Sequence, residues 1–150
     1  MRIGPKDSTL DDKGRITIPK PIREQFSGPL IITWGLEHCA WVMTSSFFNE
    51  KFVKRLESGD LTQEERLSLE DKLINMAEDA EMDSQGRIAI PSMLRRYAGL
   101  SKACIIIPAE NRFAIWDVDQ YFGYRDIDDD TVKAGYNKLG PKNLFSSDEG

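Results

Sequence analysis

The sequence is poor in the residues that most often carry chemistry in small proteins. It has one histidine, His38, and two cysteines, Cys39 and Cys104, which lack the spacing of metal ligands. Two isolated cysteines indicate reduced, buried thiols in a cytosolic protein. His38 and Cys39 are sequence neighbours, whose side chains point to opposite faces of a strand, so they do not predict a catalytic pair. We therefore expect no enzyme, no metal and no cofactor.

Long apolar runs are also missing. No stretch approaches the length of a membrane span, and the first ten residues, MRIGPKDSTL, lack the apolar core of a signal peptide. Hydrophobic residues make up 40% of the chain and charged residues 30%, which is ordinary for a soluble protein. We expect a cytoplasmic protein without a membrane partner.

Basic residues are outnumbered, and the net charge of −5 at first argues against a nucleic-acid partner. The charge is uneven, however. Residues 1–29 hold six basic and four acidic residues, and residues 82–104 hold four and one. Residues 44–81 hold five and ten, and residues 117–150 hold four and eight. Two basic segments on an acidic chain allow a local anionic partner.

The acidic run DIDDD at 126–130 lacks the glycine and final glutamate of a calcium loop, and it predicts a solvated helix start or loop.

Both basic segments contain the same motif. LDDKGRITIP begins at residue 10, and MDSQGRIAIP occurs 72 positions later. Seven of the thirteen positions 11–23 are identical in the second copy, where unrelated segments would share roughly one. We call residues 11–15 the first motif turn and residues 83–87 the second motif turn.

Each copy predicts the same order of elements. A short strand, at Ser8–Asp11 or Glu81–Asp83, leads into a turn in which Gly14 or Gly86 takes a positive φ. The alternating run RITI or RIAI predicts a half-buried strand, and the next proline opens a short helix. A hairpin of LIIT with AWVM, or of CIII with FAIW, completes the copy.

Helical patterns come after the first copy over residues 45–57 and 63–79, the second of them with a capping box at Thr62 and Glu65. Residues 117–139 are weakly helical in pattern, and the polar last stretch, GPKNLFSSDEG (140–150), predicts disorder. Four short strands cannot bury a core alone, but two copies could pair into one closed barrel with pseudo-two-fold symmetry. We expect an α+β chain divided into residues 1–58, 59–80, 81–123 and 124–150.

The motif turns combine an aspartate with an arginine four residues later. One interpretation is an ion pair that stabilises the turn, although an exposed pair of that kind contributes little to the stability of the fold. A structural turn needs its glycine but does not need arginine, and both copies retain it. Arginine suits forked hydrogen bonds to guanine or phosphate. We therefore favour an arginine that the turn presents to a ligand and the aspartate orients.

The two motifs, LDDKGRITIPKPIR and MDSQGRIAIPSMLR, together with the hairpin IITWGLEHCAWV, resemble the MraZ family of AbrB-like bacterial transcription regulators over about residues 3–123. The resemblance implies a pseudo-two-fold swapped-hairpin β-barrel of two AbrB-like repeats with helices packed outside. It also implies DNA contacts by Asp11, Arg15, Asp83 and Arg87. Members of the family form rings on G-rich direct repeats in the promoter of the division and cell-wall gene cluster, usually repressing it.

The resulting expectation is a homo-oligomeric, nucleoid-associated regulator that binds double-stranded promoter DNA and no small molecule. Four further basic residues are expected on phosphates: Lys13, Arg23, Arg95 and Arg96. The alternative is an AbrB-like antitoxin or scaffold that binds a protein partner. Antitoxins of that class usually carry one motif per chain and a disordered tail, whereas the second motif here lies inside the part predicted to fold.

Overall fold

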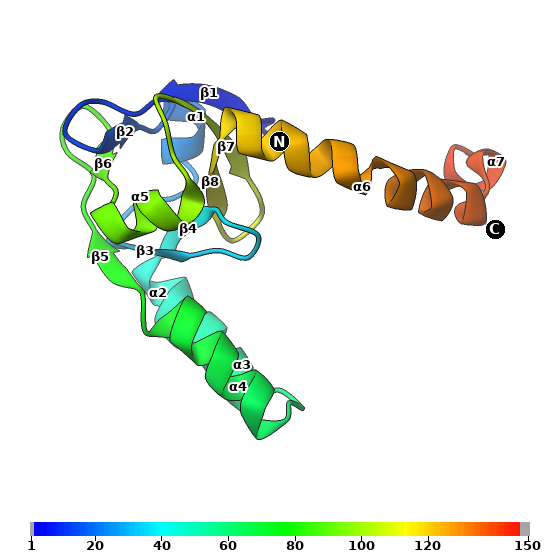
Figure 1. Cartoon of the computed structure of the whole chain (residues 1–150), viewed down its shortest axis with the longest axis horizontal. Coiled ribbons are helices and arrows are strands. Elements are labelled where there is room, and N and C mark those ends of the chain that lie inside the picture. Colours follow the sequence, from blue (N-terminus) through cyan, green and yellow to red (C-terminus); the bar gives the residue numbers. More distant parts are fainter. Residues whose placement is uncertain (1, 148–150) are drawn as a thin grey trace. The chain divides into compact units, whose positions relative to one another are not determined.

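The computed structural model describes residues 2–147, except for the side chains of residues 125–128. It divides into two compact units, Met1–Val118 and Asp119–Gly150. Helices and an antiparallel sheet make it an α+β protein, as expected (Figure 1). Its elements are β1 (Lys6–Thr9), β2 (Arg15–Thr17), α1 (Lys20–Arg23), β3 (Leu30–Trp34), β4 (Ala40–Thr44), α2 (Ser45–Phe47), the π-helical turn η1 (Phe48–Phe52), α3 (Val53–Ser58), α4 (Gln63–Leu69), the π-helical turn η2 (Glu70–Ile74), β5 (Glu78–Ala80), β6 (Arg87–Ala89), α5 (Ser92–Ala98), β7 (Ala103–Pro108), β8 (Phe113–Asp117), α6 (Val118–Leu139) and α7 (Pro141–Leu144).

The strands of the first unit form two sheets. One has six strands in the order β1-β7-β8-β4-β3-β5, and the other is a ribbon of β2 and β6. Single bridges, Leu10 with Ile16 and Met82 with Ile88, join the ribbon to the residues just after β1 and β5. Among the described residues the strands do not close into one barrel, because the ribbon joins the larger sheet only through these bridges; the closed barrel expected from the repeat is therefore not confirmed.

The strand that precedes each motif turn, β1 or β5, pairs with the hairpin of the other repeat, and the register is the same in both pairings. We call these two strands the entry strands. β1 of the first repeat pairs with β7 of the second, where Ser8 lies opposite Cys104. β5 of the second repeat pairs with β3 of the first, where Ala80 lies opposite Leu30. Each entry strand therefore completes the hairpin of the other repeat.

The core contains the same positions of both repeats. Ile16, Ile18 and Ile22 of the first copy are fully buried, and their equivalents in the second copy, Ile88, Ile90 and Leu94, are at most 1% exposed. All six belong to one cluster with the hairpin residues. Each such side chain stabilises the fold by about 1.5–3 kcal/mol, and no half can form this core alone.

The helices after the first repeat form a helical arm, residues 45–74. Phe48 packs with Ile31 and Met43 at its base, and Arg66 donates to the main-chain oxygens of Leu56 and Gly59 between the two helices. The capping box of Thr62 and Glu65 is confirmed. The helix predicted over 63–79 was too long, because Glu78–Ala80 pair with β3 and the last helical turn ends at Ile74. The strand predicted at Glu81–Asp83 was misplaced: it lies at Glu78–Ala80, and of the predicted residues only Met82 makes a single bridge.

The second unit consists of α6 and α7. The backbone of DIDDD lies within α6, and the side chains of residues 126–128 are outside the described residues. Residues 141–144, where disorder was expected, form the short helix α7 because Gly140 has a φ of 84° and Pro141 suits a first helical position. Within residues 2–147, no helix is both long enough and apolar enough to cross a bilayer.

Candidate nucleic-acid interface

The first motif turn is held by one carboxylate. Asp11 Oδ1 accepts the backbone N–H groups of Lys13 and Arg15, each at 2.9 Å, and Oδ2 accepts Arg15 Nε at 2.8 Å. Gly14, with a φ of 77°, donates to the Asp11 carbonyl at 3.0 Å. The turn therefore fixes the side chain of its arginine as well as its own backbone.

The second motif turn repeats this network. Asp83 Oδ1 accepts from the backbone of Gln85 and Arg87 at 2.9 Å, and Oδ2 accepts Arg87 Nε at 2.8 Å. Gly86 has a φ of 80°. Position three of the turn, Lys13 or Gln85, contributes only its backbone N–H to this network, which explains why its side chain differs between the copies.

Both aspartates are held in the ionised form. Hydrogen bonds from the backbone N–H of Arg15, and then from its side chain, lower the pKa of Asp11 below its ordinary 3.8. The same contacts from Arg87 lower the pKa of Asp83. Because each aspartate engages Nε, the terminal nitrogens of each guanidinium lie outside this contact and keep the donors that a forked acceptor requires.

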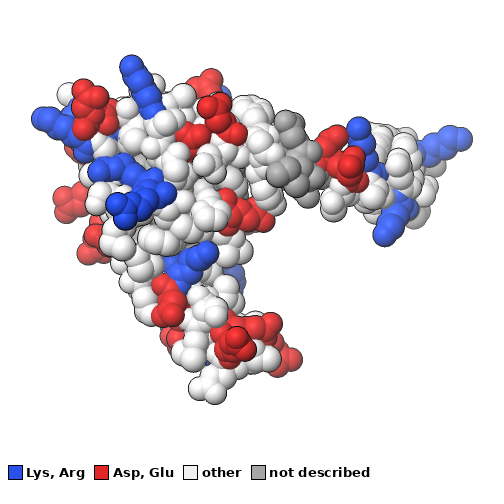
Figure 2. All heavy atoms as spheres, viewed as in Figure 1, with Lys and Arg blue, Asp and Glu red and all other residues white. Residues whose placement is uncertain are grey.

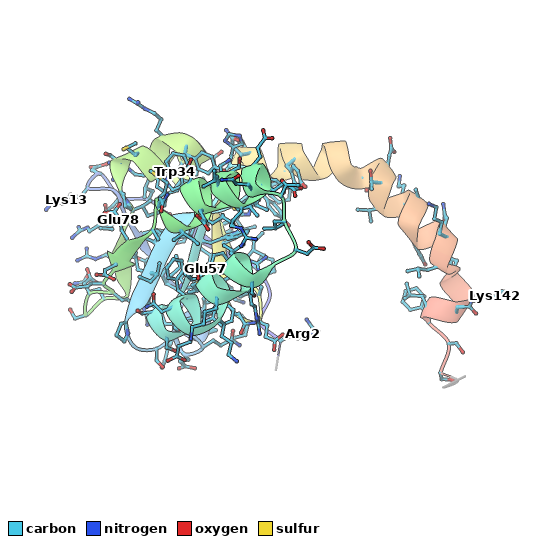
Figure 3. All side chains as sticks on the ribbon, turned by 90° about the horizontal axis from the view of Figure 1, so that it is seen from below. Arg2, Lys13, Trp34, Glu57, Glu78 and Lys142 are labelled. Carbon is cyan, nitrogen blue, oxygen red and sulfur yellow. The ribbon has the colours of Figure 1, made fainter. Side chains whose placement is uncertain are left out.

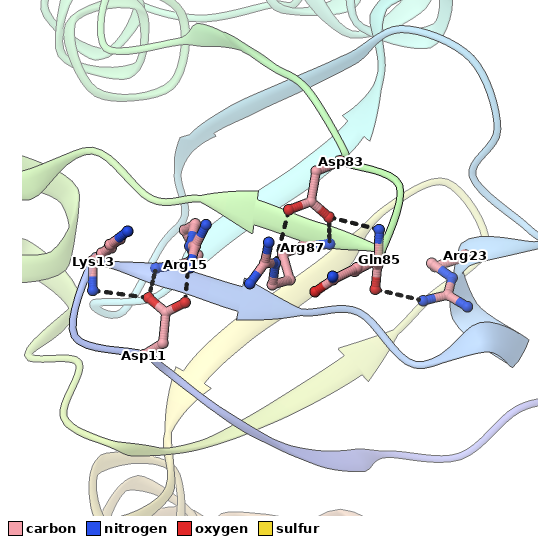
Figure 4. Close-up of polar contacts among 7 residues, drawn as sticks. All are labelled: Asp11, Lys13, Arg15, Arg23, Asp83, Gln85 and Arg87. Carbon is pink, nitrogen blue, oxygen red and sulfur yellow. Dashed lines mark hydrogen bonds and ion pairs between the residues drawn. The ribbon is translucent and has the colours of Figure 1, made fainter.

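The ribbon places the two arginines on one face. Arg15 lies opposite Ala89 and Arg87 lies opposite Thr17, while the intervening pair, Ile16 with Ile88, is buried. Alternation along a strand then puts both arginines on the outer face (Figure 4). Their side chains are 30% and 27% exposed, respectively. Thr17 and Ala89 lie on the same face; sequence reasoning missed them because the alternation was visible but the pairing of the two strands was not.

The other expected basic residues divide into two kinds. Lys13 and Arg96 are exposed, and Lys13 projects from the edge of the first unit (Figure 3). Arg23 and Arg95 are half-buried and donate to main-chain oxygens, Arg23 to Gln85 at 3.3 Å and Arg95 to Ile90 at 2.9 Å. Figure 2 shows basic side chains at the end of the first unit with β2, β6 and α5, and a cluster of acidic ones at the tip of the helical arm.

The two cysteines have the environment that sequence predicts for structural thiols. Both are buried and free. Burial raises the pKa of Cys39 to about 12 and that of Cys104 to about 11, so neither is a thiolate at neutral pH. In the part of the chain that the structure describes, no three His, Cys, Asp or Glu residues group as a metal site would require.

Comparison with known proteins gives consistent matches. The family model described as "MraZ protein, putative antitoxin-like" matches residues 1–71 and 73–131. The chain is 37% identical over 126 residues to a transcriptional regulator MraZ of Saccharopolyspora erythraea, covering 84% of this chain and 87% of that protein. It is 34% identical to the regulator of that name from Frankia alni (87% and 91% covered). It is 37% identical to the one from Treponema denticola (81% and 85% covered).

Proposed function

The chain belongs to the MraZ family, and from this premise we propose that it is a DNA-binding transcriptional regulator whose two motif turns recognise bases. The relatives that it matches are named transcriptional regulators. The observation that carries the proposal is the pair of arginines on one face of the β2–β6 ribbon, each oriented by its own aspartate.

The geometry of the ribbon suits a groove of DNA. Diagonal neighbours on such a ribbon lie about 7–8 Å apart, close to two steps of about 3.4 Å along a DNA strand. The major groove admits a two-stranded ribbon, and arginine pairs there with guanine O6 and N7. Arg15 and Arg87 would bind guanines of a G-rich direct repeat, with Asp11 and Asp83 orienting them. Lys13 and Arg96 would contact phosphates. Arg23 and Arg95, which the sequence also placed on phosphates, are left out of these contacts because both donate to main-chain oxygens.

The finer architecture belongs to the same proposal. The crossed pairing of β1 with β7 and of β5 with β3 supports a swapped-hairpin barrel of two AbrB-like repeats, with the ribbon at its open edge. The division of the chain after residues 58, 80 and 123 is retained as part of it.

A chain with two base-recognising arginines selects few base pairs, so we propose a homo-oligomer, a ring, on successive repeats. Its target would be the promoter of the division and cell-wall gene cluster, which it would repress from the cytoplasm at the nucleoid.

Substitution of the arginines tests the proposal. Duplexes are first selected by the wild-type protein from random sequence. Arg15→Ala and Arg87→Ala should each weaken binding to them and relax the preferred base, since one forked contact contributes about 1–3 kcal/mol. Arg55→Ala, which removes an exposed arginine of α3 in the helical arm, is the matched control.

Three results would contradict parts of it. If Arg15→Ala and Arg87→Ala both bind the selected duplexes as the wild type does, the turns are structural and other residues recognise the bases. If the wild-type protein selects no duplex at all, the antitoxin or scaffold alternative replaces the DNA-binding function, and the family description includes the words "antitoxin-like". If light scattering finds a monomer at micromolar concentration with and without DNA, the ring is wrong.

A further inference from the structure

Each motif glycine is covered by an arginine of the other repeat. A Cβ built on Gly86 would lie 2.7 Å from Arg23 Cδ and 2.8 Å from its Cζ. A Cβ built on Gly14 would lie 2.6 Å from Arg95 Cζ. Both glycines are buried although they lie in surface turns. The motif therefore needs glycine for two reasons, the positive φ and the guanidinium that lies against it.

The hydrogen bond of Arg23 crosses between the repeats, whereas that of Arg95 stays within its own repeat and reaches Gly14 through Ile90. Arg23 Nη1 donates to the carbonyl of Gln85, inside the second motif turn (Figure 4). Arg95 Nη1 donates to the carbonyl of Ile90, next to Gly14 of the first turn. The backbone repeats the exchange, because Ile18 donates to Gly86 at 2.8 Å and Ile90 donates to Gly14 at 2.9 Å. Thus the helix of each repeat supports the motif turn of the other.

We propose that Arg23 and Arg95 are positioning residues for base recognition, and that each acts on the opposite repeat: Arg23 positions Arg87, and Arg95 positions Arg15. This inference rests on the function proposed above. The motif arginine takes its direction from the aspartate and backbone of its turn, so a turn that tilts carries the guanidinium away from its base. A covering guanidinium fixes the tilt before DNA binds, which lowers the ordering cost of binding.

A contact with phosphate alone would give different behaviour. It would lower affinity for every sequence alike and reduce the salt dependence of binding. It would also act independently of both motif arginines. Positioning instead couples Arg23 to Arg87, in the other repeat, and leaves it uncoupled from Arg15, in its own repeat.

Two double-mutant cycles on the full chain separate these behaviours. Affinities for the selected duplex and its single-base variants are measured for Arg23→Ala combined with Arg87→Ala, and for Arg23→Ala combined with Arg15→Ala. We expect the first double variant to bind within about threefold of Arg87→Ala alone, and the losses in the second to multiply. Lys20→Ala removes an exposed charge from the same helix and is the matched control. Its loss of affinity should multiply with the losses caused by Arg87→Ala and by Arg15→Ala.

A conservative variant provides a readout independent of fold stability. Arg23→Lys retains the charge but loses the planar group that covers Gly86, so its loss of base preference should resemble that of Arg23→Ala. It also replaces Arg23→Ala in both cycles if that variant does not fold. The proposal is overturned if Arg23→Lys restores wild-type preference, or if the losses of Arg23 and Arg87 multiply. A failure of the proposed function is distinct, because Arg15→Ala and Arg87→Ala would then have no effect on DNA binding.

Discussion

The two repeats have the same motif turn, but the helices that follow it differ. In the first repeat, α1 has only four residues and contains Pro21 in its first turn. In the second, α5 has seven residues and ends at Gly99, which has a φ of 59°. Leu100 there donates to the Arg95 carbonyl at 3.0 Å, closing the helix end in the Schellman pattern. The aspartate contacts of the two turns nevertheless agree within 0.1 Å.

The loop of the first hairpin is also held by an aromatic side chain of α5, Tyr97, for which the first repeat has no aromatic equivalent. Glu37 and His38 both have a φ of 67°, which is strained for residues with side chains. Tyr97 of α5 stacks on Trp34 at 4.2 Å and on His38 at 4.8 Å, and its hydroxyl donates to the Gly35 carbonyl at 2.6 Å. The equivalent of Tyr97 in the first repeat is Gln25, which is exposed.

This comparison shows that the hydrogen bonds inside the motif turn are determined locally, whatever sets the tilt of the turn as a whole. Five residues supply its carboxylate, its glycine and its three donors, and the supporting helix can change without altering them. Differences between the repeats should therefore affect stability more than the geometry of the turns.

The largest expected effect concerns the shared core. Ile22→Ala in α1 and its equivalent Leu94→Ala in α5 each remove a fully packed side chain and should lower the free energy of unfolding by about 2–5 kcal/mol. Because both residues belong to one cluster, each variant should shift a single unfolding transition of the first unit. Urea unfolding monitored by tryptophan fluorescence measures this. Two transitions, each sensitive to one variant, would mean that the repeats fold separately.

A smaller effect should appear in one repeat only. Tyr97→Phe keeps the stacked ring but leaves the buried Gly35 carbonyl without its donor, which costs about 1–3 kcal/mol. The matched change in the first repeat, Gln25→Ala, is at an exposed position and should shift stability by no more than about 0.5 kcal/mol. Thermal unfolding compares the two. Equal losses would mean that the hydrogen bond from the Tyr97 hydroxyl does not stabilise the hairpin.

The sequence predicted the features that depend on neighbouring residues. The positive φ of Gly14 and Gly86, the aspartate–arginine contacts, the hairpins and the capping box all arise from local patterns. Both free, buried cysteines were also predicted correctly.

The features that could not be predicted from the sequence depend on contacts between residues that are distant in the chain. Residues 78 and 79 were predicted as the end of a helix, yet residues 78–80 form a strand because they pair with β3. Arg23 and Arg95 were predicted as phosphate contacts from charge alone. Their positions over Gly86 and Gly14 arise only from the crossed pairing of the two repeats.

The repeats also differ in the segment after each of them, and the helical arm after the first can be tested for a part in DNA binding. Glu57→Lys with Glu64→Lys reverses two exposed charges on α3 and α4 without touching Glu65, whose side chain caps α4. Affinity for random duplexes should rise several-fold at low salt, and base preference should not change. The neutral pair Glu57→Gln with Glu64→Gln should give about half that rise in free energy. Loss of specific binding in a folded, assembled protein would place the arm in the DNA interface.

The smallest effect tests the equivalence of the turns themselves. The hydrogen bonds from Arg15 and Arg87 lower the pKa of Asp11 and Asp83 below 3.8, so the unfolded chain holds each proton more tightly than the folded one. Each carboxylate therefore stabilises the fold above the unfolded value, and this contribution is lost as the pH falls through the lower folded value. Asp11→Asn and Asp83→Asn should each be slightly less stable than the wild type near neutral pH, and the difference should shrink as the pH falls below 3.8. Urea midpoints measured from about pH 7 to about pH 2.5 provide the curves. Because the two networks match, the two curves should coincide. A clear separation would show that α1 and α5 do alter the turns they support, and the local account of the motif would then fail.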